Sequence, residues 1–78
     1  MTLNDLPRGS VCKIVKIMLD DSSVRRLKNL GLVKGNKAKI VRFSPKKGLI
    51  EVYTNGFFLA IRRQTAEKII VTVMPKGE

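Results

Sequence analysis

The sequence predicts a mainly β domain, a small barrel of about five strands with one short inserted α-helix. Three observations support this fold class. The chain has 78 residues, of which 44% are hydrophobic, so it can build one compact core but not a second. Five short segments rich in β-branched and aromatic residues are separated by turn-forming residues. A single segment has the apolar spacing of an amphipathic helix.

The chain begins with a short ordered lead-in that is followed by the first strand. Leu3 and Leu6 in the lead-in are expected to pack on the core. The first strand is predicted over residues 11–18 and is rich in Val and Ile. In a regular strand Lys13 and Lys16 would point to opposite faces, so the strand has no purely apolar face and no purely polar one. We therefore expect both faces of this strand to be covered over part of its length.

A helix is predicted over residues 24–30, with its leucines on one face. It follows an acidic, hydroxyl-rich cluster over residues 20–23, in which either serine can cap the first free backbone N–H groups. Gly31 fits the left-handed position just past the helix. Leu32 can then contact Leu27, which is the apolar contact of a Schellman-type stop.

Four further strands complete the predicted sheet, over residues 37–43, 49–54, 57–62 and 69–74. Asn55-Gly56 indicates a type I′ hairpin turn, in which both residues adopt positive φ. Residues 63–66 allow no more than one helical turn. Five strands and one helix in so short a chain favour closure into an SH3-like barrel, because closure avoids exposed edges. We expect a single domain over residues 1–78, with its core over about 6–73 and a loose C-terminal tail.

The four aromatic side chains are expected to contribute mainly to the core. They are Phe43, Tyr53, Phe57 and Phe58. Phe57 and Phe58 are adjacent in a predicted strand and must point to opposite faces, so that one of them can be exposed. We therefore predict that three of the four are buried.

Positive charge is concentrated in the middle of the chain. Sixteen Lys and Arg residues against six Asp and Glu give a net charge of +10, and no acidic residue occurs over residues 22–50. This block favours an anionic partner, but it is equally compatible with a solvated face that keeps a small protein soluble. The candidate patch for an anionic partner consists of Lys28, Lys34, Lys37, Lys39, Arg42, Lys46 and Lys47.

Several classes of function are disfavoured by what the sequence lacks. It has no His and a single cysteine, Cys12, so we expect no enzyme, no cofactor and no dedicated metal site. The adjacent Asp20 and Asp21 are interpreted as a helix-cap region rather than as metal ligands. No glycine-rich phosphate-binding loop is present in the sequence. Without a long apolar run or the features of a signal peptide, the protein is expected to be cytoplasmic.

Several short motifs together resemble a known family. They are Leu6-Pro7-x-Gly9, then Arg25-Arg26-Leu27-x-x-Leu30-Gly31-Leu32-x-x-Gly35, and then Ala60-x-Arg62 followed by Ala66-x-x-Ile69-x-Val71. In this order and spacing the chain resembles the ferrous iron transport protein A family (FeoA). The resemblance extends from about Leu6 to Val73, and the central motif is its most specific part.

The resemblance implies a small cytosolic accessory protein of bacterial ferrous iron uptake. Its expected partner is the membrane Fe(II) permease, ferrous iron transport protein B, which carries a cytosolic GTP-binding domain and would recruit the protein to the inner face of the membrane. The helix and the turn after it are then the candidate partner-binding surface, although their leucines can also simply pack on the barrel. The residues concerned are Arg25, Arg26, Leu27, Leu30, Gly31 and Leu32.

Two alternatives remain at this stage. A basic SH3-like barrel that binds RNA or DNA accounts for the charged block and predicts binding that weakens steeply with salt. A detached regulatory domain related to iron-dependent repressors would share the barrel, but the sequence has no helix-turn-helix with which to read DNA. The oligomeric state stays open between a monomer and a weak oligomer.

Overall fold

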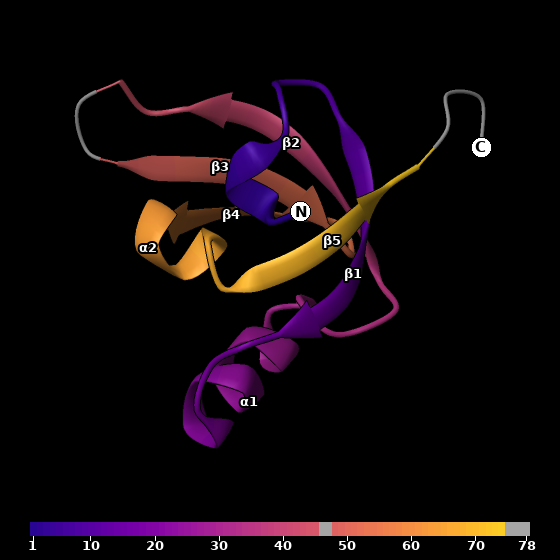
Figure 1. Cartoon of the computed structure of the whole chain (residues 1–78), viewed down its shortest axis with the longest axis vertical. Coiled ribbons are helices and arrows are strands. Elements are labelled where there is room, and N and C mark those ends of the chain that lie inside the picture. The colour runs from indigo at the N-terminus through magenta and orange to yellow at the C-terminus, as the bar shows by residue number, and fades with distance from the viewer. Residues whose placement is uncertain (46–47, 75–78) are drawn as a thin grey trace.

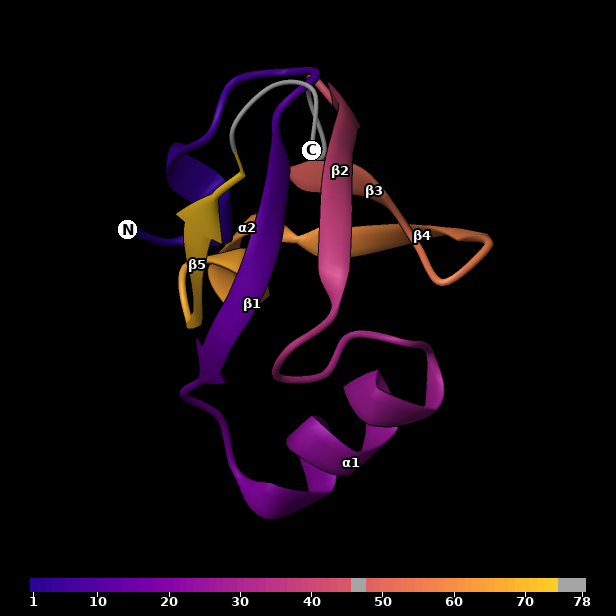
Figure 2. The ribbon, with the colours of Figure 1, turned by 90° about the vertical axis from the view of Figure 1, so that its right-hand side faces the viewer.

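Five antiparallel strands form one curved sheet in the order β4-β3-β2-β1-β5, as expected for the predicted SH3-like barrel (Figure 1). The computed structural model describes residues 1–45 and 48–74. Helix α1 lies at one end, outside the curve of the sheet (Figure 2). The elements are η1 Leu3–Asp5, β1 Val11–Ile17, α1 Asp21–Asn29, β2 Lys37–Phe43, β3 Leu49–Thr54, β4 Phe57–Arg62, α2 Arg63–Ala66 and β5 Ile69–Val73.

The predicted bounds of β2, β3 and β4 are confirmed, and β5 ends one residue earlier than expected. Between β3 and β4, Asn55 has a φ of 53° and Gly56 a φ of 84°, as the type I′ turn requires. The expected C-terminal tail over residues 75–78 lies outside the described residues.

Strand β1 buries one face only, which corrects the prediction that both faces are covered. Its residues alternate up to Ile14, which is buried, while Val15 is exposed. The register with β5 shifts between Ile14 and Lys16, which places a β-bulge at Val15. This extra residue resets the alternation, so that Lys13 and Lys16 are both exposed in spite of their opposite parities.

Helix α1 begins at Asp21, three residues before the predicted start, so the serines lie within its first turn instead of capping it. Asp20 is the N-cap residue, and its carboxylate accepts a hydrogen bond of 2.6 Å from the Ser22 hydroxyl. No residue of the helix is fully buried. Leu27 packs against the core, and Leu30 caps the C-terminal end.

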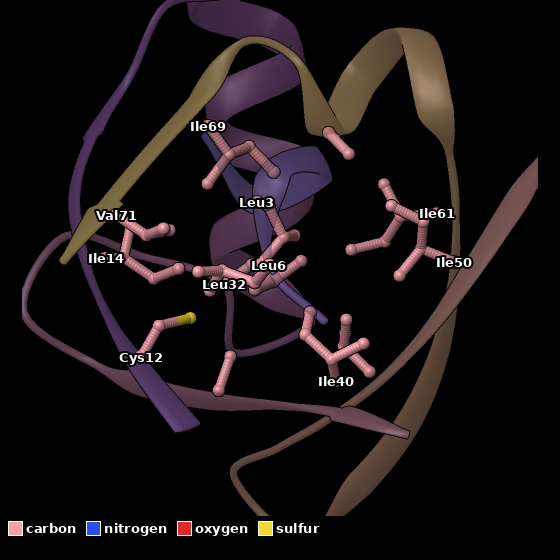
Figure 3. Packing of buried hydrophobic residues seen from close by; sticks show 13 residues of the cluster. Leu3, Leu6, Cys12, Ile14, Leu32, Ile40, Ile50, Ile61, Ile69 and Val71 are labelled. Carbon is pink, nitrogen blue, oxygen red and sulfur yellow. The ribbon is translucent and has the colours of Figure 1, made fainter. Parts of the chain in front are cut away.

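The core fills the inside of the curved sheet (Figure 3). Both leucines of the lead-in are buried in it, as predicted, and Leu32 is fully buried in the same cluster. Each of these side chains adds about 1.5–3 kcal/mol of hydrophobic stabilisation. The cluster consists of Leu3, Leu6, Cys12, Ile14, Leu32, Ala38, Ile40, Ile50, Val52, Ile61, Ala66, Ile69 and Val71.

Three of the four aromatic side chains are exposed, so the prediction that three are buried is wrong. Tyr53 is 41% exposed, Phe57 60% and Phe58 65%. Phe43 is partly buried against the core, with the Arg63 guanidinium 5.3 Å from its ring centroid. Tyr53 and Phe58 lie on the outward face of their strands, which nothing covers at these positions, whereas Phe57 has the inward parity of Ile61 and is exposed at the hairpin end.

Strand β5 is not left unpaired at the end of the sheet. It pairs with β1 along one edge, and on the other edge the Val71 N–H donates to the Met1 carbonyl at 2.9 Å. Thr2 and Ile70 form an additional antiparallel bridge. The N-terminal segment therefore covers part of this edge, which disfavours dimerisation through it.

Candidate docking cleft between helix α1 and strand β4

The six residues predicted for partner binding divide into a structural group and an accessible group. Gly31 and Leu32 are buried and form the helix stop: the Leu32 N–H donates to the Leu27 carbonyl at 2.9 Å, and the Gly31 N–H donates to the Lys28 carbonyl at 3.0 Å. With a φ of 95° at Gly31, this is the predicted Schellman motif. Gly31 and Leu32 consequently hold the helix on the barrel and offer no side chain to a partner.

Arg26, Leu27 and Leu30 line a cleft of about 420 Å³ between α1 and the end of β4. Leu27 is half-buried and forms part of its apolar floor, whereas Leu30 is 44% exposed. Arg25 is exposed on the same helix but does not line the cleft. The remaining lining residues come from both sides: Leu19, Ser23, Ala60, Ile61, Arg62 and Thr65.

The cleft combines an apolar floor with a cationic rim. Arg26 and Arg62 are both exposed at it, and none of the described lining residues is acidic. Arg26 contacts the Ser23 hydroxyl at 3.5 Å, which leaves most of its five N–H donors available. Such a cleft suits a ligand with an apolar side chain flanked by carboxylates.

The cleft also borders the free edge of the sheet. Within residues 1–45 and 48–74, strand β4 pairs with β3 alone, and Ala60 lies opposite Glu51 in that ladder. In a two-residue hairpin the pair next to the turn, here Thr54–Phe57, is hydrogen-bonded, and so is every second pair after it. Ala60 belongs to a pair that is not hydrogen-bonded, so its backbone N–H and C=O point away from β3. An extended segment placed in the cleft would therefore meet unpaired backbone groups as well as the apolar floor.

The described residues of the predicted anionic-partner patch come from several elements. Lys37 and Lys39 are exposed on β2, whereas Lys28 and Lys34 are exposed around the C-terminal end of α1. Arg42 donates to the Glu51 carboxylate at 2.8 Å and forms an exposed ion pair. Lys46 and Lys47 lie outside the described residues.

The described residues contain no group of three or more His, Cys, Asp or Glu side chains arranged to hold a metal ion. Cys12 is buried, and this burial raises the pKa of its thiol to about 11, so the sulfur is neutral at physiological pH. Hydrogen bonds from Ser22 and Ser23 lower the pKa of the exposed Asp20 carboxyl to about 2. Asp20 therefore acts as an ionised group at the N-terminus of the helix, consistent with the cap interpretation.

Sequence reasoning missed the β4 side of the cleft. Ala60 and Arg62 were noticed only as part of a short motif, and Ile61 was assigned to a strand without a further role. The sequence signal for this side was the presence of two motifs about 30 residues apart, one on the helix and one on β4. The fold brings these two motifs to opposite sides of one cleft.

The model of the FeoA domain family matches residues 1–73. The chain belongs to the FeoA domain family. This confirms the resemblance that was based on the three groups of motifs. Among functionally curated proteins the comparison found no significant match.

Solved structures of FeoA proteins share the fold. The FeoA protein of Chlorobium tepidum is 38% identical, with a TM-score of 0.90 over 100% of this chain and 74% of that one. Iron(II) transport protein A of Clostridium thermocellum is 25% identical, with a TM-score of 0.86 over 94% of this chain and 45% of that one. The zinc complex of Stenotrophomonas maltophilia FeoA is 29% identical, with a TM-score of 0.72 over 92% and 89%; that protein is described as an SH3 domain protein and suggested as an activating factor of ferrous iron transport.

Family membership associates the chain with ferrous iron transport and confirms the SH3-like fold. In the part of the chain that the structure describes, no helix is long and apolar enough to cross a membrane.

Proposed function

We propose that this FeoA-family chain is a non-enzymatic accessory protein of bacterial ferrous iron uptake. It acts in the cytoplasm by binding the cytosolic portion of the membrane Fe(II) permease, ferrous iron transport protein B. The observation that carries the proposal is the cleft between α1 and β4, because the two motifs that face each other across it belong to the family resemblance.

The chemistry of the cleft indicates how the permease would be held. An apolar side chain of the partner would occupy the floor at Leu27 and Leu30, and a carboxylate beside it would pair with Arg26 or Arg62. Buried apolar contacts supply most of the affinity in such an arrangement, whereas the exposed charges mainly orient the partner.

A small binding protein can alter transport by shifting a conformational equilibrium. If the docked protein binds one state of the permease's cytosolic domain more tightly, that state becomes more populated, and the equilibrium shifts by at most the ratio of the two affinities. No catalytic group of the accessory protein is required, and the lack of His in the chain is compatible with this mechanism.

The test compares two matched charge reversals on helix α1 with a substitution at its C-cap residue. Binding of the detergent-solubilised permease is measured for the wild type, Arg26→Glu, Leu30→Asp and Arg25→Glu, with far-UV circular dichroism of each variant as the folding control. Arg26→Glu and Leu30→Asp are expected to weaken binding by about tenfold or more, the loss typical of a residue at the centre of an interface. Arg25→Glu is expected to change it less than about twofold, because an exposed charge outside the contact contributes little.

Equal effects of Arg25→Glu and Arg26→Glu would mean that only the overall positive charge matters, and the cleft would then not be the docking site. Fe(II) uptake in cells that lack the protein provides the second readout. Rescue by Arg25→Glu but not by folded Leu30→Asp is expected. Rescue by both would contradict the proposal.

A further inference from the structure

The tip of the β3–β4 hairpin carries three exposed aromatic side chains, although the chain has only four in total. Tyr53, Phe57 and Phe58 are 41%, 60% and 65% exposed. Isolated exposed apolar residues are ordinary, but three exposed aromatic rings within six residues concentrate apolar surface at one hairpin tip. This tip faces away from the barrel (Figure 2) and is distinct from the cleft between α1 and β4.

The rings are exposed on both faces of the hairpin. Phe57 and Phe58 are neighbours in β4 and project to opposite sides. On one side the ring of Phe58 packs against that of Tyr53, with centroids 4.9 Å apart and a tilt of 57°. On the other side Phe57 is the first residue after the turn and lies opposite Thr54.

The tip is held in a fixed position by contacts at its base. The Thr54 hydroxyl donates to the Lys37 carbonyl at 2.8 Å, and the side chain of Asn55 lies directly over Gly31 at the helix stop. The exposed rings are therefore presented by a braced hairpin, and little conformational entropy is lost when they bind a partner.

The surface beside the rings is cationic. Lys37 and Lys39 line a shallow depression with Tyr53 and Asn55. Arg8 and Lys39 line a second one, of about 660 Å³, which also contains Tyr53 and Phe58. No described residue that lines either depression is acidic.

Glu51 precedes Tyr53 by two residues in β3 and lies on the same face of the strand. Its carboxylate accepts the hydrogen bond from Arg42 at 2.8 Å. The cations beside the rings are consequently not neutralised by it, and they are available to an anionic surface.

We propose that this hairpin tip binds an anionic lipid bilayer, with its aromatic side chains in the headgroup region and with Arg8, Lys37 and Lys39 contacting lipid phosphates. Aromatic rings favour the membrane interface, and basic residues beside them are attracted by anionic lipids. The tip carries both the aromatic rings and the basic residues. A hairpin that enters the bilayer end-on contacts lipid with both of its faces.

A flat partner fits the tip less well. Single-stranded nucleic acid stacks its bases on aromatic rings of one face and would use Tyr53 and Phe58, but it would leave Phe57 unused on the opposite face. An acidic peptide lying across β2 and β3 has the same shortcoming. The exposure of Phe57 is thus the feature that favours the bilayer.

The membrane contact is additional to permease binding and does not depend on it. If both occur, each contact raises the effective concentration of the protein for the other, because the permease lies in the same membrane. The test below uses the protein and lipid alone, so that failure of one proposal leaves the other standing.

The experiment measures co-sedimentation of the purified protein with vesicles of phosphatidylcholine alone and of phosphatidylcholine with phosphatidylglycerol. The variants are Phe57→Ser with Phe58→Ser, Lys37→Glu with Lys39→Glu, and the matched control Val73→Ser. Val73 is 48% exposed and lies on β5, at the other edge of the sheet. Circular dichroism confirms that each variant is folded.

Wild type and Val73→Ser are expected to bind the anionic vesicles with equal partition coefficients and the neutral vesicles weakly. The double Phe variant is expected to lose about tenfold or more in partition coefficient, at low and at high salt alike. The double Lys variant should lose a similar factor at low salt only, because salt screens its contribution.

Three results would overturn the proposal. The first is an absence of wild-type binding to anionic vesicles. The second is unchanged binding by the double Phe variant, which would show attraction by net charge alone. The third is binding of a single-stranded oligonucleotide that is tighter than vesicle binding and requires Tyr53 and Phe58 but not Phe57, which would assign the surface to nucleic acid.

Discussion

Gly31 allows a quantitative test of how helix α1 is fixed to the barrel. Its φ of 95° is a conformation that residues with a side chain rarely adopt. A Cβ at this position would also lie 2.8 Å from the Cβ of Asn55, 3.4 Å from its Nδ2 and 3.5 Å from its Cγ. Gly31→Ala therefore combines backbone strain with a steric clash against the hairpin tip.

The two contributions can be separated with a matched glycine. Gly35 has a φ of 96°, and a Cβ there would meet nothing within 4 Å. Gly35→Ala is therefore expected to cost backbone strain alone, about 1–2 kcal/mol. Gly31→Ala should cost the same strain and a further 1–3 kcal/mol, about the range for overpacking a well-packed site.

The assay is urea unfolding at 25 °C, followed by far-UV circular dichroism. With a slope of about 1 kcal/mol per molar urea for a small domain, Gly35→Ala should lower the midpoint by about 1–2 M and Gly31→Ala by clearly more. A domain of this size has a free energy of unfolding of about 4–12 kcal/mol, so Gly31→Ala can bring it near the threshold of folding.

A second substitution tests the cause of the clash. Asn55→Gly removes the clashing Cβ together with the rest of the side chain, and it retains a residue that tolerates the positive φ of the turn. In the double variant the additional cost of the clash at Gly31 should disappear. The double variant should then be about 1–3 kcal/mol more stable than the sum of the two single effects predicts. Equal destabilisation by Gly31→Ala and Gly35→Ala, or an absence of rescue, would refute the reasoning.

Three other substitutions address the core and the helix start. Leu32→Ala should lower the free energy of unfolding by about 2–5 kcal/mol in urea unfolding, because a fully buried side chain leaves a cavity. For Cys12 the thiol pKa is about 11 in the folded chain against 9.0 as its ordinary value, so the folded state binds more protons between these pH values. The contribution of Cys12 to the free energy of unfolding should accordingly be constant below about pH 9 and fall by about 2–3 kcal/mol between pH 9 and 11, and the difference between wild type and Cys12→Ala in thermal unfolding isolates it. For Asp20 the pKa is lowered from 3.8 to about 2, so its stabilising contribution is present above about pH 4 and is lost as the pH falls towards 2. Asp20→Asn should remove that part of the acid dependence of helical circular dichroism, and an unchanged profile would contradict the role of the Ser22 hydrogen bond.

Local signals were sufficient for most of the fold. The Asn55-Gly56 turn, the Gly31 helix stop and the bounds of three strands are each determined by residues within a few positions of one another, and all are confirmed. The error in the helix start occurs where local signals compete. Asp20, Asp21 and the two serines after them are all good cap residues, so the sequence does not select which of them begins the helix.

The misassigned aromatics have a different origin. Alternation along β4 correctly divides its residues between two faces, but it does not indicate where the core ends. Phe57 has the parity of the buried Ile61, yet it is 60% exposed at the hairpin end of β4, whereas Ile61 lies at the other end, next to α2. Burial at a strand end is a property of the whole fold and is not encoded in the strand's own pattern.

For the same reason the sequence predicts the helix side of the docking cleft but not the β4 side. Helix residues 24–30 could be selected from their own spacing, because their exposed and apolar positions are local. The contribution of Ala60 and Arg62 depends on how the hairpin returns past the helix, and that contact joins segments about 30 residues apart. Pairing two motifs across the sequence requires the fold.

The contact between Gly31 and Asn55 joins the two proposed binding surfaces. Gly31 follows Leu30, which lines the cleft, and Asn55 precedes the exposed Phe57 by two residues. A perturbation at this contact displaces both surfaces together, so loss of permease binding or of lipid binding by Gly31→Ala would not identify either site. Substitutions of exposed side chains that leave the contact intact, Arg26→Glu in the cleft and Phe57→Ser at the tip, avoid this ambiguity. If the surfaces are separate, each of these variants should lose one binding activity and retain the other.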